Sequence, residues 1–307
     1  MTAQFDIRVG QDAVRFERQV RVRGAMAAAG RSGLTPRSNG SPELKKASYI
    51  NAQNQLAARG QDPGAIALID MGRASDHPDL QGRIVESKYL PDQPSKADHA
   101  MQVAGVIAAH CSAPIHHYNV WRTSGLDRNA YLTALTSVIE SGVRVLNLSI
   151  GSLDRDDVAA GLIRDCINAG VIVIAAMGDY GDDRPVFPAA TDGVIAVGAC
   201  NRHGRPVRTT SKGAHAFIAA PGESIVTVQG ENSHRKQDGT SFATPMISAA
   251  VWLASRNLNL PDSAEAQAVM RDLLKASVVT PGAPHDLQIG WGALDLAGLA
   301  NNVLQHA

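Results

Sequence analysis

Short apolar runs alternate with longer segments of helical spacing along most of this chain. The runs are continuous rather than alternating in polarity, which is typical of parallel strands buried on both faces. This order predicts an α/β domain with a mostly parallel central sheet covered by helices on both faces, a three-layer α/β/α arrangement. We expect strands at residues 65–70, 115–121, 143–149, 171–176 and 194–199. We expect helices at residues 42–59, 99–109, 127–141, 156–169, 241–255 and 263–275, and from about 293 onward.

Composition limits the size of the domain and its partners. The chain has 307 residues, of which 44% are hydrophobic, enough for one large core. Its 29 basic and 29 acidic residues balance, so the charge does not favour nucleic acid or a membrane surface as a partner. No apolar stretch approaches the roughly 18 residues of a transmembrane helix.

A Gly-Thr-Ser-Phe-Ala-Thr-Pro run at residues 239–245 precedes an apolar stretch. The pattern places Ser241 at the start of a helix, with Pro245 in the first turn, where no backbone donor is needed. Free N–H groups and the helix dipole at such an end favour an oxyanion beside the serine oxygen. A serine at this position is also a common helix cap, so the run alone fits either a nucleophile or a cap.

Two further segments carry an acid and a histidine. Asp70 ends an apolar run and is expected at the carboxyl end of a buried strand, where open α/β sheets gather their ligands. His99 begins a helix of small residues that can pack closely on a sheet. Taken singly, Asp70 fits a turn residue and His99 fits a neighbour of a helix cap.

Together, in the order Asp, His, Ser, these segments resemble the subtilisin-like serine proteases, the subtilases. Residues 69–72 with 77–80 resemble the aspartate motif of the family, 99–105 its histidine motif and 239–245 its serine motif. The resemblance extends from about Gly64 to Leu294. It implies a subtilisin-like fold and a serine endopeptidase with the catalytic triad Asp70, His99 and Ser241.

The resemblance also assigns roles within the triad. A serine hydroxyl is a poor nucleophile at neutral pH and needs a base within hydrogen-bond reach. His99 would take the proton of Ser241 and later return it to the leaving amine. Asp70 would hold the imidazole in the correct tautomer and stabilise its charged form.

The oxyanion hole is where this chain departs from its family. The resemblance implies two donors, the backbone N–H of Ser241 and the side chain of Asp179, where most subtilases have asparagine. An ionised Asp179 cannot donate a hydrogen bond, whereas a protonated one can. Either burial raises the pKa of Asp179 enough to keep its proton, or the enzyme is slow at neutral pH.

The family resemblance places the substrate cleft between two segments. An extended peptide would pair with residues 149–151, and residues 176–178 would form another wall of the pocket for the residue before the cut. Val186 is expected at the floor of this pocket, where glycine is common in the family, and would disfavour large aromatic side chains. The expected substrate-binding residues are Ser149, Ile150, Gly151, Ala176, Met177, Gly178 and Val186.

We expect no cofactor and no metal ligands. Only about three residues separate the 99–109 helix from Ala113-Pro114, too few to wrap the tight calcium ion of many subtilases. The acidic groups at residues 154–157 and 182–183 are expected to be solvated loops, although a weak calcium site there stays an alternative. His116 and His117 are expected on opposite faces of one strand, which argues against joint metal binding.

Residues 1–40 differ from the rest, and we divide the chain into an N-terminal extension, 1–40, and a catalytic domain, 41–307. The extension contains a small-residue stretch at 24–33 and looks too short for a folded prodomain. A short inhibitory segment, an arm that docks a partner protein, a strand packed on the core and a frayed arm all remain open. The first 30 residues lack the apolar core of a signal peptide, and Cys111, Cys166 and Cys200 have no metal spacing, so a cytoplasmic location is expected.

The sequence therefore predicts a serine endopeptidase acting on a peptide or protein, most simply by selective processing of a precursor. A peptide ligase or macrocyclase would use the same triad, with an amine in place of water. A weakly active fold that binds peptides or proteins is a third reading, favoured by Asp179 and opposed by the intact triad.

Overall fold

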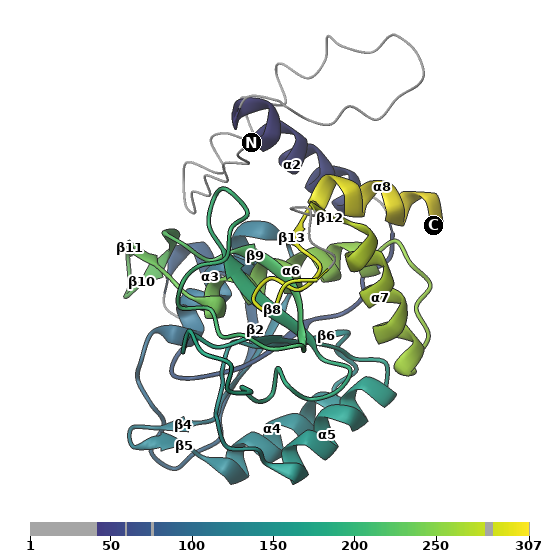
Figure 1. Ribbon diagram of the computed structural model, residues 1–307. Coiled ribbons are helices and arrows are strands. Elements are labelled where there is room, and N and C mark those ends of the chain that lie inside the picture. The colour runs from purple at the N-terminus through teal and green to yellow at the C-terminus, as the bar shows by residue number, and fades with distance from the viewer. Residues whose placement is uncertain (1–41, 59, 75–76, 280–284, 307) are drawn as a thin grey trace, which may run out of the picture.

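The computed structural model describes residues 42–58, 60–74, 77–279 and 285–306 (Figure 1). The predicted extension at residues 1–40 lies outside this part of the chain. Within it, a nine-stranded sheet has the order β12-β13-β9-β8-β7-β6-β1-β3-β2. Its strands are β1 (Ile66–Asp70), β2 (Ile84–Tyr89), β3 (Ile115–Asn119), β6 (Val145–Leu148), β7 (Ile172–Ala176), β8 (Ile195–Cys200), β9 (Ala216–Pro221), β12 (Val278–Val279) and β13 (Ala293–Leu294). Only the β12–β13 pair is antiparallel, which confirms the mostly parallel sheet.

Helices cover both faces of the sheet and make the predicted three layers. They are α2 (Pro42–Ala57), α3 (His99–His110), α4 (Arg128–Glu140), α5 (Asp157–Asn168), α6 (Thr240–Ser255), α7 (Ala264–Ala276) and α8 (Leu296–His306). Successive residues of β1 alternate between two cores: Ile66 and Leu68 pack with α3 and α6, and Ile69 packs with α4 and α5. Helices α4 and α5 lie together on one side of the sheet in Figure 1. Because both faces are buried, every residue of β1 is fully buried, as its apolar sequence predicts.

Several short strands were not predicted. Two of them, β10 (Ile225–Gln229) and β11 (Ser233–Gln237), form a separate hairpin; β4 (Trp121–Arg122) and β5 (Gly125–Leu126) form another. Four of the five residues of β11 are exposed, so its polar sequence carries no apolar pattern. The predicted strand at 115–121 ends at Asn119, and Trp121 begins β4 instead.

Helix α6 begins one residue earlier than predicted, and Pro245 lies inside it rather than in its first turn. Proline has no N–H, so the Ser241 carbonyl, one turn earlier, lacks its usual helical donor. The Ser149 hydroxyl donates to that carbonyl instead, at 2.9 Å. The proline thus leaves an acceptor through which the start of α6 is bonded to the end of β6.

No helix in the described ranges has both the length and the apolar character needed to cross a bilayer.

Candidate active site

Asp70 and His99 meet at the carboxyl end of β1. Asp70 is fully buried, and its Oδ1 lies 2.5 Å from Nδ1 of His99, the first residue of α3. The same oxygen accepts the Met71 N–H at 2.6 Å, which fixes the orientation of the carboxylate. With Nδ1 held by Asp70, Nε2 of His99 is the ring nitrogen left for another partner. The His99 side chain is 23% exposed, so a substrate can reach it.

The charges around His99 raise its pKa. Burial alone would lower the pKa, but the attraction and hydrogen bond of Asp70, together with the nearby charge of Asp179, outweigh burial. A histidine accepts a proton only when it is neutral. The pH above which His99 can act as a base therefore lies higher than for a free imidazole.

Ser241 lies in the first turn of α6, one residue before Phe242, which contacts the imidazole of His99. The ring of His99 packs at 5.9 Å from the ring of Phe242, centroid to centroid. The Ser241 hydroxyl donates to the Ser149 carbonyl at 3.1 Å, reciprocal to the Ser149 bond described above. Because it belongs to the first turn, the Ser241 N–H has no acceptor within the helix. The three residues of the predicted triad thus lie at one edge of the sheet.

Further hydrogen bonds from buried side chains support the Ser149–Ser241 pair. The amide of Asn147 donates to the Ser149 hydroxyl oxygen at 3.0 Å, and the Ser248 hydroxyl donates to the Asn147 side-chain oxygen at 2.8 Å. Asn147 and Ser248 are fully buried. This buried chain of hydrogen bonds fixes β6 against α6 beneath the serine, and sequence reasoning did not find it.

Asp179 follows β7 and turns its carboxylate onto the first turn of α6. Its oxygens accept the Thr240 N–H at 3.0 and 3.2 Å and the Thr240 hydroxyl at 3.2 Å. Gly239 leaves room for this contact, because a Cβ there would lie 2.9 Å from Oδ2 of Asp179. Thr240 in turn accepts the Gly178 N–H at 3.1 Å. Thr240 was missed by the sequence analysis, although it lies inside the serine motif.

The surrounding protein raises the pKa of Asp179. Desolvation of its carboxylate outweighs the hydrogen bonds from Thr240 and the charge of His99, both of which act to lower the pKa. The residue as a whole is exposed at the sheet edge, while its carboxylate is turned inward. The direction is the one expected for an acid that retains its proton to a higher pH.

Two of the predicted substrate residues, Gly151 and Gly178, lie against a third, Val186. A Cβ built on Gly151 would lie 2.7 Å from one methyl of Val186, and one built on Gly178 would lie 2.9 Å from the other. Val186 is fully buried and fills the space between these two glycines. The side chains of Ala176 and Met177 are also buried.

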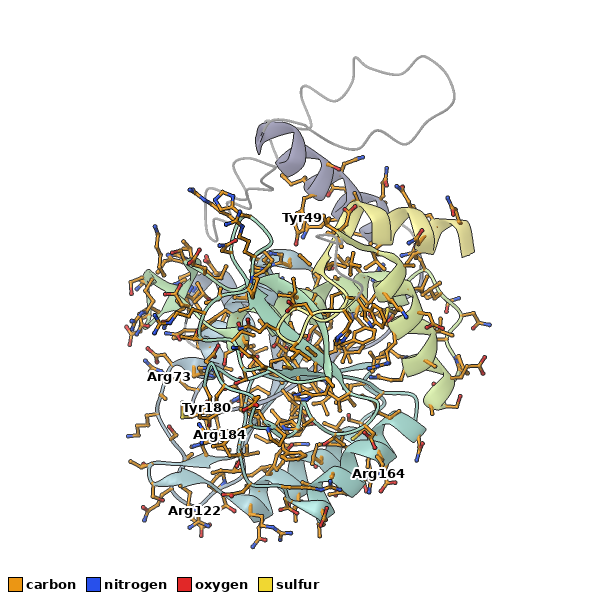
Figure 2. The ribbon with its side chains drawn as sticks, viewed as in Figure 1. Tyr49, Arg73, Arg122, Arg164, Tyr180 and Arg184 are labelled. Atoms are coloured by element: carbon orange, nitrogen blue, oxygen red, sulfur yellow. The ribbon has the colours of Figure 1, made fainter. Side chains whose placement is uncertain are left out.

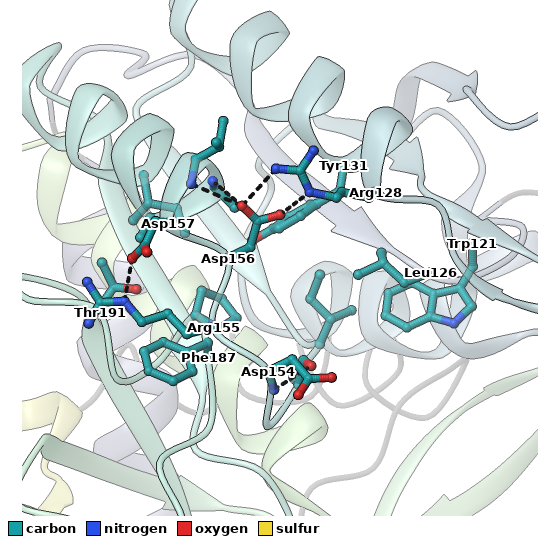
Figure 3. A pocket seen from close by; sticks show the side chains of 18 residues that line it. Trp121, Leu126, Arg128, Tyr131, Asp154, Arg155, Asp156, Asp157, Phe187 and Thr191 are labelled. Atoms are coloured by element: carbon teal, nitrogen blue, oxygen red, sulfur yellow. Dashed lines mark hydrogen bonds and ion pairs between the residues drawn. The ribbon is translucent and has the colours of Figure 1, made fainter.

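Beside this group, Ile150 and Gly151 line a cavity of about 710 Å³ (Figure 3). Its other lining residues include the large side chains Trp121, Leu126, Tyr131 and Phe187. At its edge, Arg128 pairs with Asp156 at 2.5 Å and Arg155 with Asp157 at 2.7 Å. These two carboxylates of the predicted acidic loop are thus paired with arginines.

The second acidic loop is also paired. Arg184 bonds to Asp182 at 2.8 Å, and its guanidinium lies 5.4 Å from the centre of the Tyr180 ring. Arg184 and Tyr180 are labelled in Figure 2. Pairing with arginine lowers the pKa of Asp182. Each of the two predicted acidic groups therefore has arginine side chains as partners for some of its carboxylates.

A buried histidine next to Asp70 makes the fold sensitive to acid. His117 is fully buried, and burial lowers its pKa from 6.5 to about 4, in spite of the Asp70 carboxylate. Between these two values only the unfolded chain binds the proton, so stability is full above pH 6.5 and falls as the pH drops. At about 1.4 kcal/mol per pH unit, the loss reaches about 3 kcal/mol at pH 4.

This loss can be measured by urea denaturation of the Ser241→Ala protein between pH 7 and 4. We expect the stability of a His117→Asn variant to fall less steeply over this range than that of its parent. Equal slopes for the two proteins would show that His117 does not cause the acid sensitivity.

Comparisons with known proteins agree with the fold described above. The sequence pattern described as "Subtilase family" matches residues 63–292. A "Thermophilic serine proteinase" from Bacillus sp. (strain AK1) is 30% identical over 66% of this chain, and this chain spans about half, 54%, of its length. "Subtilisin BL" from Lederbergia lenta is 29% identical over 62% of this chain and 76% of its own.

Two solved structures share the fold. A structure titled "Crystal Structure of a Lanthipeptide Protease" has a TM-score of 0.65 at 22% identity and covers 84% of this chain and 95% of its own. "Structure of Prenylagaramide maturation protease PagA" has a TM-score of 0.69 at 24% identity and covers 82% and 98%.

Proposed function

This chain belongs to the subtilase family, and from that premise we propose that it is a serine endopeptidase that hydrolyses peptide bonds through an acyl-enzyme. The observation that carries the proposal is the hydrogen bond between Asp70 and His99 beside the helix start that presents Ser241. A buried acid, an imidazole and a hydroxyl in this order are what nucleophilic catalysis by serine needs.

In the proposed reaction the Ser241 hydroxyl turns from the Ser149 carbonyl to Nε2 of His99. An extended peptide whose N–H bonds to the Ser149 carbonyl would displace the hydroxyl from it. His99 takes the proton as Ser241 attacks the scissile carbonyl, and returns it to the leaving amine. Water then cleaves the acyl-enzyme by the same path in reverse. Each of these steps uses side chains of this protein, and none calls for a cofactor.

The oxyanion that forms on the scissile carbonyl would be stabilised by the Ser241 N–H and by a protonated Asp179. The raised pKa of Asp179 supports this assignment. An ionised Asp179 would repel the oxyanion, so the reaction would be slow wherever Asp179 has lost its proton.

For the substrate class we propose a peptide or protein precursor that is cut at selected sites. The support is likeness in fold to the two proteins whose titles name a lanthipeptide protease and a maturation protease, an argument by analogy. A macrocyclase would give a product lighter by one water than the linear product of hydrolysis, so intact mass separates ligation from hydrolysis. Three unpaired, buried cysteines support a cytoplasmic location. Docking of a partner by residues 1–40 also remains a proposal.

Val186 is proposed to limit the side chain accepted before the cut. We expect the parent enzyme to prefer small side chains there and Val186→Gly to cleave after Phe or Tyr at least tenfold faster, since it opens the space between Gly151 and Gly178. A peptide library in which only this substrate position varies measures the change. Val226→Ala on β10, far along the chain from this pocket, serves as the control. A parent enzyme that already prefers Phe or Tyr would contradict the role of Val186.

Labelling with a fluorophosphonate tests the proposed function directly. The purified protein, read by intact mass from about pH 4 to 9, should gain one label, and Ser241→Ala should gain none. A folded protein that takes no label at any of these pH values would instead favour a subtilase fold that binds peptides or proteins without cleaving them. Label on a residue other than Ser241 would refute the assignment of the nucleophile.

A further inference from the structure

A second cluster of chemically active side chains joins two distant segments of the chain. His77 and Asp79 flank Pro78 at the short helix η2 (Pro78–Leu80), and His234 lies on β11, 155 residues from Asp79. One donor atom from each of the three residues lies within 4.8 Å of the other two. Among the residues that the structure describes, these three form the one such group found.

His77 is oriented as metal-binding histidines are. Its side chain is only 2% exposed, and its Nε2 lies 3.2 Å from the Ser233 carbonyl, to which it donates. That bond leaves the lone pair on Nδ1, which lies 3.9 Å from Oδ2 of Asp79. In this structure the lone pair accepts the Asp79 N–H at 3.2 Å, so a bound metal would replace that hydrogen bond. A remote ring nitrogen that donates to a backbone carbonyl is the usual support of a histidine ligand, since it fixes tautomer and ring direction.

The other two donors face the same point. Nε2 of His234 lies 2.8 Å from Oδ2 of Asp79, and the rings of His77 and His234 are nearly perpendicular, at 5.0 Å between centroids. Asp79 and His234 are 22% and 32% exposed, so water can complete the set. His77 also lines a surface hollow of about 690 Å³ that includes Glu231, an open route for an ion.

We propose that His77, Asp79 and His234 bind a transition-metal dication of the zinc class, with water as the fourth ligand. Two imidazoles and one carboxylate are a ligand set that suits zinc, whereas calcium takes six or more oxygens. Tetrahedral bonds of about 2.1 Å place ligand atoms about 3.4 Å apart. The observed separations lie on both sides of that value, so small side-chain rotations bring all three donors onto one ion.

The ion would bind the β10–β11 hairpin to the loop that follows Asp70. The hairpin already contacts α3 through side-chain amides: Gln102 bonds to Gln229 at 2.6 Å and to Gln237 at 2.9 Å. The metal adds a link on the other flank of this hairpin, which leads into the helix of Ser241. Its role is structural and takes no part in the proposed peptide cleavage, so either proposal can fail without the other.

Calorimetric titration of tag-free Ser241→Ala protein with Zn²⁺, and separately with Ca²⁺, tests the site without self-cleavage. We expect one Zn²⁺ per chain with no response to Ca²⁺, and visible absorption typical of tetrahedral coordination when Co²⁺ is used. His234→Gln and Asp79→Asn should each weaken Zn²⁺ binding at least tenfold. His203→Gln, outside the cluster, should bind as its parent does.

His234→Gln decides the case even if Asp79→Asn fails to fold, because His234 is exposed on a hairpin strand. Unchanged Zn²⁺ affinity in that variant, or no Zn²⁺ binding by the parent up to about 1 mM, would show that the cluster is an ion pair only. A preference for Ca²⁺ would overturn the assignment of the metal class.

Discussion

Replacing Asp70 with asparagine is expected to lower kcat/KM by about 10⁴-fold at neutral pH. The Asp70 carboxylate accepts the Nδ1 proton of His99 and so leaves Nε2 free to take the proton of Ser241. An asparagine amide can donate to Nδ1 instead, which moves the ring proton to Nε2 and removes the base. Steady-state hydrolysis of a cleaved peptide by parent and variant measures the loss.

Asp98→Asn is the matched control for this change. Asp98 precedes His99 and carries a similar charge, but it accepts bonds from Arg73 at 2.9 Å and from Gln229 at 2.7 Å rather than from the imidazole. We expect it to reduce kcat/KM by less than about tenfold, because it leaves the tautomer of His99 unchanged. An Asp70→Asn enzyme that retains a tenth or more of the parent rate would contradict the assigned role of Asp70.

The sequence predicted five strands of the central sheet, most of them buried on both sides, but it missed β2 and the buried strand β9. The core strands β1, β6, β7 and β8 are continuous apolar runs, and each was predicted to within two residues at either end. β11 was missed because its exposed polar residues, bonded to β10 through the backbone, leave no hydrophobic pattern. Most of the strands that were predicted are those with continuous apolar runs. A surface strand that is held by backbone pairing leaves no such run in the sequence.

The candidate site shows the same division. Asp70, His99 and Ser241 were found through local motifs, each complete within a few residues. The contact of Asp179 with Thr240 and the cluster of His77, Asp79 and His234 join segments 61 and 155 residues apart, which no local pattern encodes. Such contacts depend on how strands and loops are placed by the sheet, so they became visible only in three dimensions.

Asp179→Asn is expected to raise the rate near neutral pH by about 10²- to 10³-fold, the effect of one good oxyanion donor. Asparagine has nearly the same shape as aspartate, so its oxygen can accept the Thr240 N–H while its NH₂ group is left to donate toward the oxyanion. Gly239 leaves space for this side chain as it does for the parent carboxylate. Rates measured from pH 5 to 9 for parent and variant give the comparison.

The same variant should also shift the pH dependence, in a direction that the charges determine. Ionised Asp179 raises the pKa of His99, so its removal lowers that pKa, and the acid limb of kcat/KM moves to lower pH. Asp183→Asn removes a charge from the same loop without touching Thr240 and should leave both rate and limb nearly unchanged. If Asp179→Asn changes neither, Asp179 has no part in the oxyanion hole. If the limb moves while the neutral rate stays constant, Asp179 carries a charge near His99 but does not contact the oxyanion.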